Sequence, residues 1–173
     1  CVAKYLFDNG IVRGTPAGVG RAVLHIEARS GVKECTVITK NGLCHQVAVD
    51  MGQVSLEPEA VPVKLSGGPV IGRRAELAGE QREITCCSMG NPHVTLFVSS
   101  VDKVNVEKLG PMIEHDPLFP ERVNVGFVEV IDSRTLKARI WERGSGETMA
   151  CGTGTCAAVV AATLNGFCPK GQD

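Results

Sequence analysis

The feature that most constrains this chain is a short stretch near its C-terminal end, residues 142–154 (ERGSGETMACGTG). A charged dipeptide leads into a glycine-rich loop, and an apolar helical pattern begins directly behind Cys151. This order places the thiol at the start of a helix, where the first backbone N–H groups lack partners within the helix and carry partial positive charge. A thiol in that position ionises more readily than a free one, and the same N–H groups can hold a carboxylate or phosphate. The pattern therefore predicts a reactive thiol beside an anion-binding site.

Cys151 also has a simpler interpretation. Cysteine is among the most buried residue types, and one at a helix start is often a small hydrophobic residue. Here glycines on both sides leave the sulfur accessible and let a ligand approach the backbone. These neighbours favour a role for Cys151 as a nucleophile or as an acid and base.

Residues 152–157 (GTGTCA) also match the dinucleotide-binding fingerprint G-x-G-x-x-A. That fingerprint requires a strand that runs directly into its first glycine and a βαβ unit around it. Ten mostly polar or glycine residues separate Trp141 from Gly152, and the remaining chain leaves no room for a βαβ unit. No Lys-Ser/Thr pair follows the glycines, as a P-loop would need. A nucleotide-binding module stays an alternative hypothesis, which binding of NAD or ATP would test.

Composition narrows the class of protein. With 173 residues, the chain can form one large domain or two small ones, and 43% apolar residues can supply a core. The net charge of −1 gives no basic excess that would attract nucleic acid or a membrane surface. The longest apolar run is too short to cross a bilayer, and no signal peptide is visible. We therefore expect a cytoplasmic protein.

Eight cysteines are a high count for this length. No C-x-x-C pair occurs, so neither a structural zinc site nor a thioredoxin-like motif is expected. Without a secretory signal, a disulfide framework is not expected either. We expect a reducing compartment in which most thiols, including Cys86 and Cys87, pack inside the protein.

Hydrophobic patterning predicts an α+β protein, because strands dominate and helices are few. The first unit has a helix and three strands; the predicted ranges are 1–8, 21–28, 35–39 and 44–51, with a hairpin turn at Asn41-Gly42. Residues 57–72 are rich in proline and glycine and predict loops and edge strands. The second unit starts near Arg82, with strands at 83–88, 94–98, 121–131 and 135–141 and helices at 104–113 and 152–164. The predicted domains are residues 1–81 and 82–173.

Five further polar residues are candidates for a site. Asn91 and His93 lie in the sequence Gly-Asn-Pro-His, which can be a purely local turn. Asn124 lies inside an apolar strand, where a buried amide must be hydrogen-bonded, either to a turn or to a ligand. Glu142-Arg143 can be a solvated ion pair of little energetic value. Alternatively, Arg143 can bind a substrate carboxylate, while Glu142 orients a neighbouring thiol or amine or takes a proton from it.

These motifs together resemble one family. Residues 142–157 closely resemble the second signature of diaminopimelate epimerases, and 90–93 and 121–127 (ERVNVGF) resemble two further blocks of that family. The blocks appear in the family's order and cover roughly residues 83–168. Residues 1–5 (CVAKY) resemble the end of the first signature, Cys-Gly-Asn-Gly-x-x-Cys.

The resemblance implies a diaminopimelate-epimerase-like fold, in which two pseudo-symmetric α+β domains each wrap a sheet around a central helix. It implies cofactor-independent epimerisation of LL- to meso-diaminopimelate, in lysine and peptidoglycan precursor biosynthesis, with one cysteine on each side of the α-carbon. It implies a homodimer with a small-molecule substrate and without metal, nucleic acid or membrane.

The resemblance also implies roles for individual residues. Cys151 is the expected acid and base thiol, and His93 and Glu142 are expected to poise the thiols. The expected substrate contacts are Asn91, Asn124, Glu142, Arg143, Gly152 and Thr153.

The chain departs from the family at its start. Cys1 matches the last cysteine of the first signature and not the catalytic one, so the second thiol is expected upstream of Cys1, and further strands are expected beyond Asp173. The chain alone is therefore predicted to lack epimerase activity. The alternatives are a related isomerase, such as a proline racemase or a phenazine-biosynthesis isomerase, or a non-catalytic fragment. The dipeptide Glu142-Arg143 and Asn124 favour diaminopimelate, because a second amino-acid head group needs polar contacts of its own.

Overall fold

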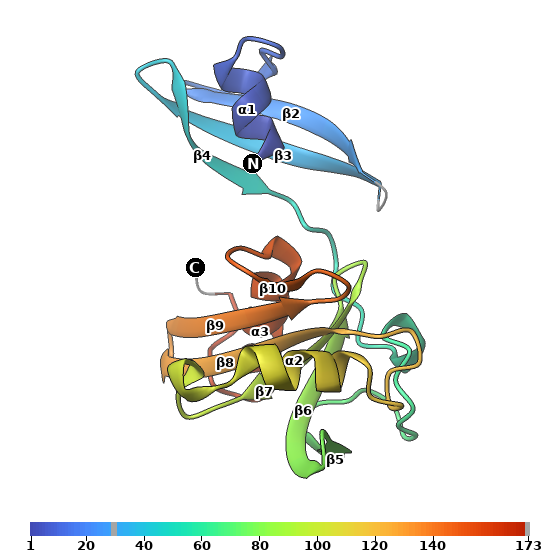
Figure 1. Ribbon diagram of the computed structural model, residues 1–173. Helices are drawn as coiled ribbons and strands as arrows, with labels where there is room; N and C mark the ends of the chain where they lie inside the picture. Colours follow the sequence, from blue (N-terminus) through green and yellow to red (C-terminus); the bar gives the residue numbers. More distant parts are fainter. Residues whose placement is uncertain (29–30, 172–173) are drawn as a thin grey trace. The chain divides into compact units, whose positions relative to one another are not determined.

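The computed structural model describes residues 1–28 and 31–171, and the chain divides into two compact units, Cys1–Gly52 and Gln53–Asp173 (Figure 1). This division differs from the boundary at residues 81 and 82 that the sequence predicts. The reason is that residues 53–81 pair and pack with segments later in the chain. Ser55 forms a β-bridge with Ser88, and Val61, Val63 and Val70 lie in the core of the second unit.

The first unit is a four-stranded antiparallel sheet with one helix. Its elements are α1 (Val2–Asp8), β1 (Thr15–Pro16), β2 (Arg21–Ala28), β3 (Gly31–Lys40) and β4 (Leu43–Val49), and the strands are ordered β1-β2-β3-β4. Asn41 and Gly42 both have positive φ angles, as a tight hairpin turn requires, so this predicted turn is confirmed. Lys4 and Asp8 of α1 bind the backbone of Cys44, which fixes the helix on β4.

The second unit holds a six-stranded mixed sheet, ordered β10-β9-β8-β7-β6-β5. Its elements are the 3₁₀ helix η1 (Pro58–Ala60), β5 (Arg73–Leu77), β6 (Glu80–Ser88), β7 (Pro92–Phe97), the 3₁₀ helix η2 (Val101–Lys103), α2 (Val106–Glu114), β8 (Asn124–Asp132), β9 (Thr135–Glu142), β10 (Gly146–Thr148) and α3 (Gly152–Leu164). Among the strands of residues 1–28 and 31–171, only β7 and β8 pair in parallel, and α2 forms the crossover between them. The predicted α+β class is confirmed.

The α-helices α2 and α3 cover opposite faces of the six-stranded sheet (Figure 1). Because side chains alternate along a strand, Val94 and Leu96 of β7 lie in the apolar core with Ile113 of α2, while His93 and Thr95 face the other way. α3 packs on that second face through small residues, which let its backbone approach the strands closely: Gly154, Ala157, Ala158, Ala161 and Ala162.

Most predicted elements are present with small shifts at their ends. β3 begins before the predicted residue 35, and β8 begins after the predicted residue 121. The strands β1, β5 and β10 were not predicted. Cys86 and Cys87 are buried in β6, as expected. Among the described residues, no helix is both long enough and apolar enough to cross a membrane.

Candidate active site

Polar side chains of the second unit gather where β7 and β8 begin, where β9 ends and where α3 begins. Asn91 immediately precedes β7, and His93 and Asn124 are paired in register at the start of β7 and β8. Cys151 is the N-cap of α3. The parallel pairing of β7 and β8 and the direction of α3 therefore bring together residues that are up to 60 positions apart (91 and 151).

The sulfur of Cys151 is held at the first turn of α3. The backbone N–H of Gly154 donates to Sγ at 3.4 Å, and the N–H of Thr155 donates to the Cys151 carbonyl at 2.9 Å. A Cβ at position 154 would lie 3.1 Å from this sulfur and 3.1 Å from Ile140 Cγ2, so a larger residue there would make tight contacts with both. Cys151 is half-buried, which leaves its thiol partly open to solvent.

A chain of hydrogen bonds runs from this sulfur to His93. Thr153 Oγ1 lies 3.6 Å from Cys151 Sγ, Asn91 Nδ2 donates to Thr153 Oγ1 at 3.3 Å, and His93 Nε2 lies 3.0 Å from Asn91 Oδ1. The Asn91 amide N–H occupies a lone pair of the threonine oxygen. The single hydroxyl proton of Thr153 is then free to point at the sulfur.

His93 is neutral at physiological pH. Burial lowers its pKa to about 4, and the positive charge of Arg143 acts in the same direction. A neutral imidazole whose Nε2 carries the proton donates to the acceptor Asn91 Oδ1. His93 therefore orients the Asn91 amide and does not supply a positive charge to the thiol.

Asn124 joins three segments of the second unit. Its Nδ2 donates to the carbonyl of Pro92 at 2.7 Å, and its Oδ1 accepts the backbone N–H of Arg143 at 2.9 Å. It is 4% exposed, so both bonds replace water that it has lost. A substrate could therefore bind Asn124 only through the second proton of Nδ2 or the second lone pair of Oδ1.

Glu142 and Arg143 lie beside this cluster but have partners of their own. The Glu142 carboxylate accepts the hydroxyl of Thr148, and Arg143 Nη1 donates to the carbonyl of Glu121 at 2.9 Å. In the described part of the chain, no hydrogen bond joins Glu142 to Cys151. The structure thus connects Cys151, Thr153, Asn91 and His93 directly, and connects Arg143 to them only through Asn124 and the backbone.

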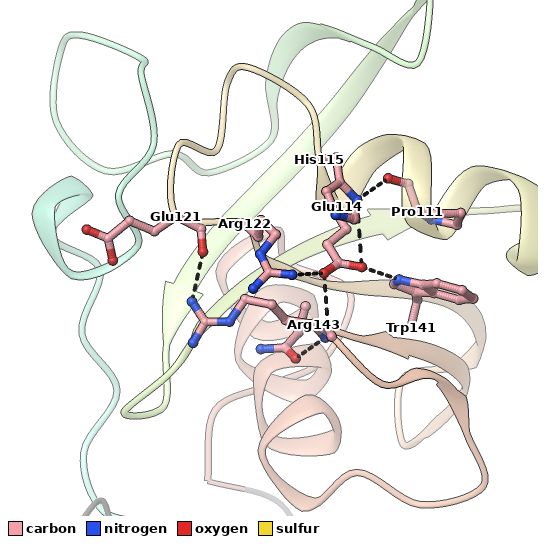
Figure 2. Close-up of polar contacts among 9 residues, drawn as sticks. Pro111, Glu114, His115, Glu121, Arg122, Trp141 and Arg143 are labelled. Atoms are coloured by element: carbon pink, nitrogen blue, oxygen red, sulfur yellow. Dashed lines mark hydrogen bonds and ion pairs between the residues drawn. The ribbon is translucent and has the colours of Figure 1, made fainter.

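The buried carboxylate of Glu114, near this site, belongs to none of the motifs identified in the sequence. Glu114, the last residue of α2, is 2% exposed and binds Trp141, Gly144 and Arg122 (Figure 2). One signal was available: a carboxylate in the last turn of a helix opposes the helix dipole. A residue in such an unfavourable place often has a specific partner.

Other thiols of the second unit are poorly suited to proton transfer. Burial raises the pKa of Cys86 to about 12 and that of Cys87 to about 11, and burial also raises the pKa of Cys156. Within residues 1–28 and 31–171, no three His, Cys, Asp or Glu side chains gather as a metal site would require.

The topology around residues 152–157 does not match that of a dinucleotide-binding site. Residues 152–157 do begin a helix, but the strand before them, β10, is antiparallel to β9 at the edge of the sheet. A dinucleotide site needs parallel strands on both sides of such a helix.

Known proteins resemble this chain in sequence. The family model "Diaminopimelate epimerase" matches residues 85–172. The diaminopimelate epimerase of Acetivibrio thermocellus is 46% identical over 166 residues, which cover 96% of this chain and 57% of the relative. That of Geobacillus kaustophilus is 48% identical over 177 residues, covering 100% and 58%. The chain thus spans just over half the length of these relatives.

Solved structures of low sequence identity share the fold. A probable proline racemase from Agrobacterium radiobacter K84 superposes with a TM-score of 0.67 at 18% identity, over 94% of this chain and 49% of that one. A hydroxyproline epimerase from Agrobacterium vitis gives a TM-score of 0.67 at 15% identity, with the same coverage. The predicted fold and the family resemblance are both confirmed.

Proposed function

Because this chain belongs to the diaminopimelate epimerase family, we propose that it carries one catalytic thiol, Cys151, of a cofactor-independent epimerase that acts on diaminopimelate. The observation that supports this most is the environment of the Cys151 sulfur. It lies at the N-terminus of α3, partly exposed, with a backbone N–H at 3.4 Å and a hydroxyl oxygen at 3.6 Å. Donors of this kind can hydrogen-bond the sulfur of a thiolate, which is the form that can take a proton.

The proposed reaction is a proton exchange at the α-carbon. The Cys151 thiolate takes the α-proton, so the Cα–H bond breaks, an S–H bond forms and the electron pair stays on carbon. A second thiol on the opposite face gives its proton to that carbon and becomes a thiolate. One base can return a proton only to the face from which it took it, so inversion requires both thiols. The second thiol is expected in the family's first signature, whose end Cys1 matches.

Charge that develops on the α-carbon needs fixed donors, because no cofactor takes part in the proposed reaction. In α3, the N–H of Gly154 is used by the Cys151 sulfur, and that of Thr155 by the Cys151 carbonyl. The N–H groups of Gly152 and Thr153 are earlier in the helix and have no acceptor within it. They are the proposed donors to the substrate carboxylate.

The remaining residues are proposed to recognise and orient the substrate. Arg143 is the proposed partner of a carboxylate, and its present bond to the Glu121 carbonyl holds it near the start of β8. Glu142 is the proposed partner of an ammonium group. Asn91 and Asn124 are proposed to bind substrate through the hydrogen-bonding capacity that their protein partners leave free, and His93 poises the thiol indirectly, through Asn91.

The family relationship also supports a proposal about where the enzyme acts, how it assembles and which pathway uses its product. We infer a cytoplasmic enzyme, homodimeric in its complete form, whose product enters lysine and peptidoglycan precursor synthesis. The chain alone is expected to be inactive, since it contains only one of the two thiols.

A chimera tests the proposed activity. In it, this chain replaces the matching segment of the Acetivibrio thermocellus relative, and turnover of LL-diaminopimelate, proline and glutamate is measured. We expect epimerisation of diaminopimelate alone, its loss in Cys151→Ser, and no turnover by the 173-residue chain. Turnover of proline in preference would assign the chain to the related racemases, and unchanged turnover in Cys151→Ser would exclude the proposed role of this thiol.

A further inference from the structure

A buried carboxylate next to the proposed site has no part in the proposed proton exchange. Glu114 ends α2, and its side chain is 3% exposed. A carboxylate removed from water is costly unless several donors replace its hydration. The identity of those donors therefore shows what the carboxylate holds in place.

The closest donors belong to one hairpin, β9–β10. Trp141 Nε1 donates to Glu114 Oε2 at 2.7 Å, and the backbone N–H of Gly144 donates to Oε1 at 2.9 Å. The Arg122 guanidinium is more distant, with Nη1 at 3.4 Å from Oε1, and His115 Nδ1, which also contacts the Pro111 carbonyl, lies 4.0 Å from Oε2 (Figure 2). Both of these side chains are more than half exposed. The carboxylate is thus bound more closely by neutral groups of the hairpin than by a salt bridge.

Packing reinforces the contact with Trp141. Gly110 lies one helical turn before Glu114, on the same face of α2. A Cβ at position 110 would come within 2.5 Å of the Trp141 ring, so the indole lies directly against the helix backbone. Gly110 and Glu114 together position the indole of Trp141. Gly110 leaves space for the ring, and Glu114 accepts a hydrogen bond from its N–H.

The loop after β9 is held at a second point. Asn124 accepts the backbone N–H of Arg143, and Glu114 accepts that of the next residue, Gly144. Two consecutive peptide N–H groups are therefore bound by buried side chains from β8 and α2. The hairpin already closes through its own bond from Ser145 N–H to the Glu142 carbonyl, so these two contacts are additional to what the turn needs.

We propose that Glu114 is a positioning residue, which through Trp141 and Gly144 fixes the loop that carries Glu142 and Arg143, and so places the Arg143 guanidinium for a substrate carboxylate. This inference rests on the proposed function. Glu114 itself touches no substrate, because its carboxylate oxygens are occupied by the hairpin and it is buried.

Glu114→Gln tests the proposal in the 173-residue chain. Glutamine has nearly the same shape, but an NH₂ group replaces one carboxylate oxygen. Since Trp141 and Gly144 bind different oxygens, one of them would then face a donor and lose its acceptor. We expect the amide resonances of Arg143 and Gly144, or the indole N–H resonance of Trp141, to shift. The chain has a single tryptophan, so its indole signal is unambiguous. Glu107→Gln, an exposed residue on the same helix, is the matched control.

A titration of the chimera described above with LL-diaminopimelate, with and without the Glu114 substitutions and followed at the same resonances, links the loop to the substrate. We expect the wild-type amides of Arg143 and Gly144 to respond saturably and Glu114→Gln to bind about tenfold more weakly, as loss of roughly one good hydrogen bond implies. Glu114→Asp keeps the charge but is one methylene shorter, and should show the same weakening.

The outcomes separate the two claims. If wild type binds diaminopimelate and both Glu114 variants bind it equally well with unshifted loop resonances, the positioning role is wrong while the proposed function stands. If wild type shows no response to diaminopimelate, the proposed function fails, and the substrate placement by Glu114 fails with it. Weaker binding by folded Glu114 variants, together with wild-type behaviour of Glu107→Gln, supports the positioning role.

Discussion

At the scale of single residues, the site is organised around hydrogen-bond direction. His93 donates to Asn91, Asn91 donates to Thr153, and the hydroxyl proton of Thr153 remains for the Cys151 sulfur. Each residue in this series of hydrogen bonds fixes the orientation of the next residue. The final hydroxyl is therefore directed by groups that do not touch the sulfur themselves.

Removal of the Thr153 hydroxyl should slow alkylation of Cys151. Thr153→Val keeps the shape of the side chain but removes a donor worth about 0.5–1.5 kcal/mol, so the rate with iodoacetamide at pH 7.5 should fall about three- to tenfold. Peptide mass spectrometry would follow each cysteine. Thr153→Ser retains the hydroxyl and should react at the wild-type rate. Cys86 and Cys87 should stay unmodified in the folded protein, since burial raises the pKa of each thiol. An equal rate in Thr153→Val would show that the hydroxyl does not act on the sulfur.

His93 should make the protein sensitive to acid. Its pKa is lowered to about 4 in the folded state from 6.5, so the unfolded chain binds a proton more readily than the folded chain between these values. The stabilising contribution is complete above pH 6.5 and is lost as the pH falls towards 4, by roughly 3 kcal/mol.

Urea unfolding at pH 7.5 and at pH 4.5 would measure this contribution. His93→Gln should show a smaller loss of unfolding free energy between the two pH values than wild type. His45→Gln, an exposed histidine in the first unit, should retain the wild-type loss. Identical losses in wild type and His93→Gln would mean that His93 takes up its proton as easily in the folded state.

At the scale of elements, α2 packs against and hydrogen-bonds the β9–β10 hairpin, which contains Glu142 and Arg143. The contact depends on Gly110, where the helix comes closest to Trp141, and on Glu114, which binds the indole and the loop. Asn124, at the start of β8, adds a hydrogen bond by accepting the backbone N–H of Arg143. The position of the loop is therefore set by two elements that precede it in the chain, α2 and β8.

Gly110→Ala should destabilise the protein, although alanine is the better helix former. The added Cβ would lie 2.5 Å from the Trp141 ring, and the resulting overpacking should cost about 1–3 kcal/mol of unfolding free energy. Lys108→Ala, on the exposed side of the same helix, should be nearly neutral. Urea titrations of both variants would measure the effect. A Gly110→Ala variant as stable as wild type would show that the indole can move away from α2 without cost.

Sequence patterns predicted elements well where one period continues for several residues. Helix α3 and strand β9 follow their predicted ranges closely. The short strand β10 lies inside a glycine-rich loop and forms because β9 offers it an edge, which no local pattern reveals. The role of Glu114 was equally hidden, since its partners lie 27 and 30 positions away along the chain.

At the scale of the whole molecule, the chain consists of two units of different size, with the proposed thiol in the second. The predicted boundary at residues 81 and 82 lies beyond the observed one, because residues 53–81 have few periodic signals but contribute Val61, Val70 and β5 to the second unit. The cluster around Cys151 was predictable in its members, because each stands in a recognisable motif. Its internal bonds were not, because they depend on how β7, β8 and α3 meet.

The proposed function depends on proton exchange between Cys151 and one face of an α-carbon. Deuterium uptake at Cα in D₂O tests it most directly, with the chimera and its Cys151→Ala variant, starting separately from LL- and from meso-diaminopimelate. We predict that Cys151→Ala abolishes epimerisation and abolishes uptake from one isomer, while the opposite thiol still permits uptake from the other. Epimerisation by the variant, or unchanged uptake from both isomers, would contradict the proposed role of Cys151.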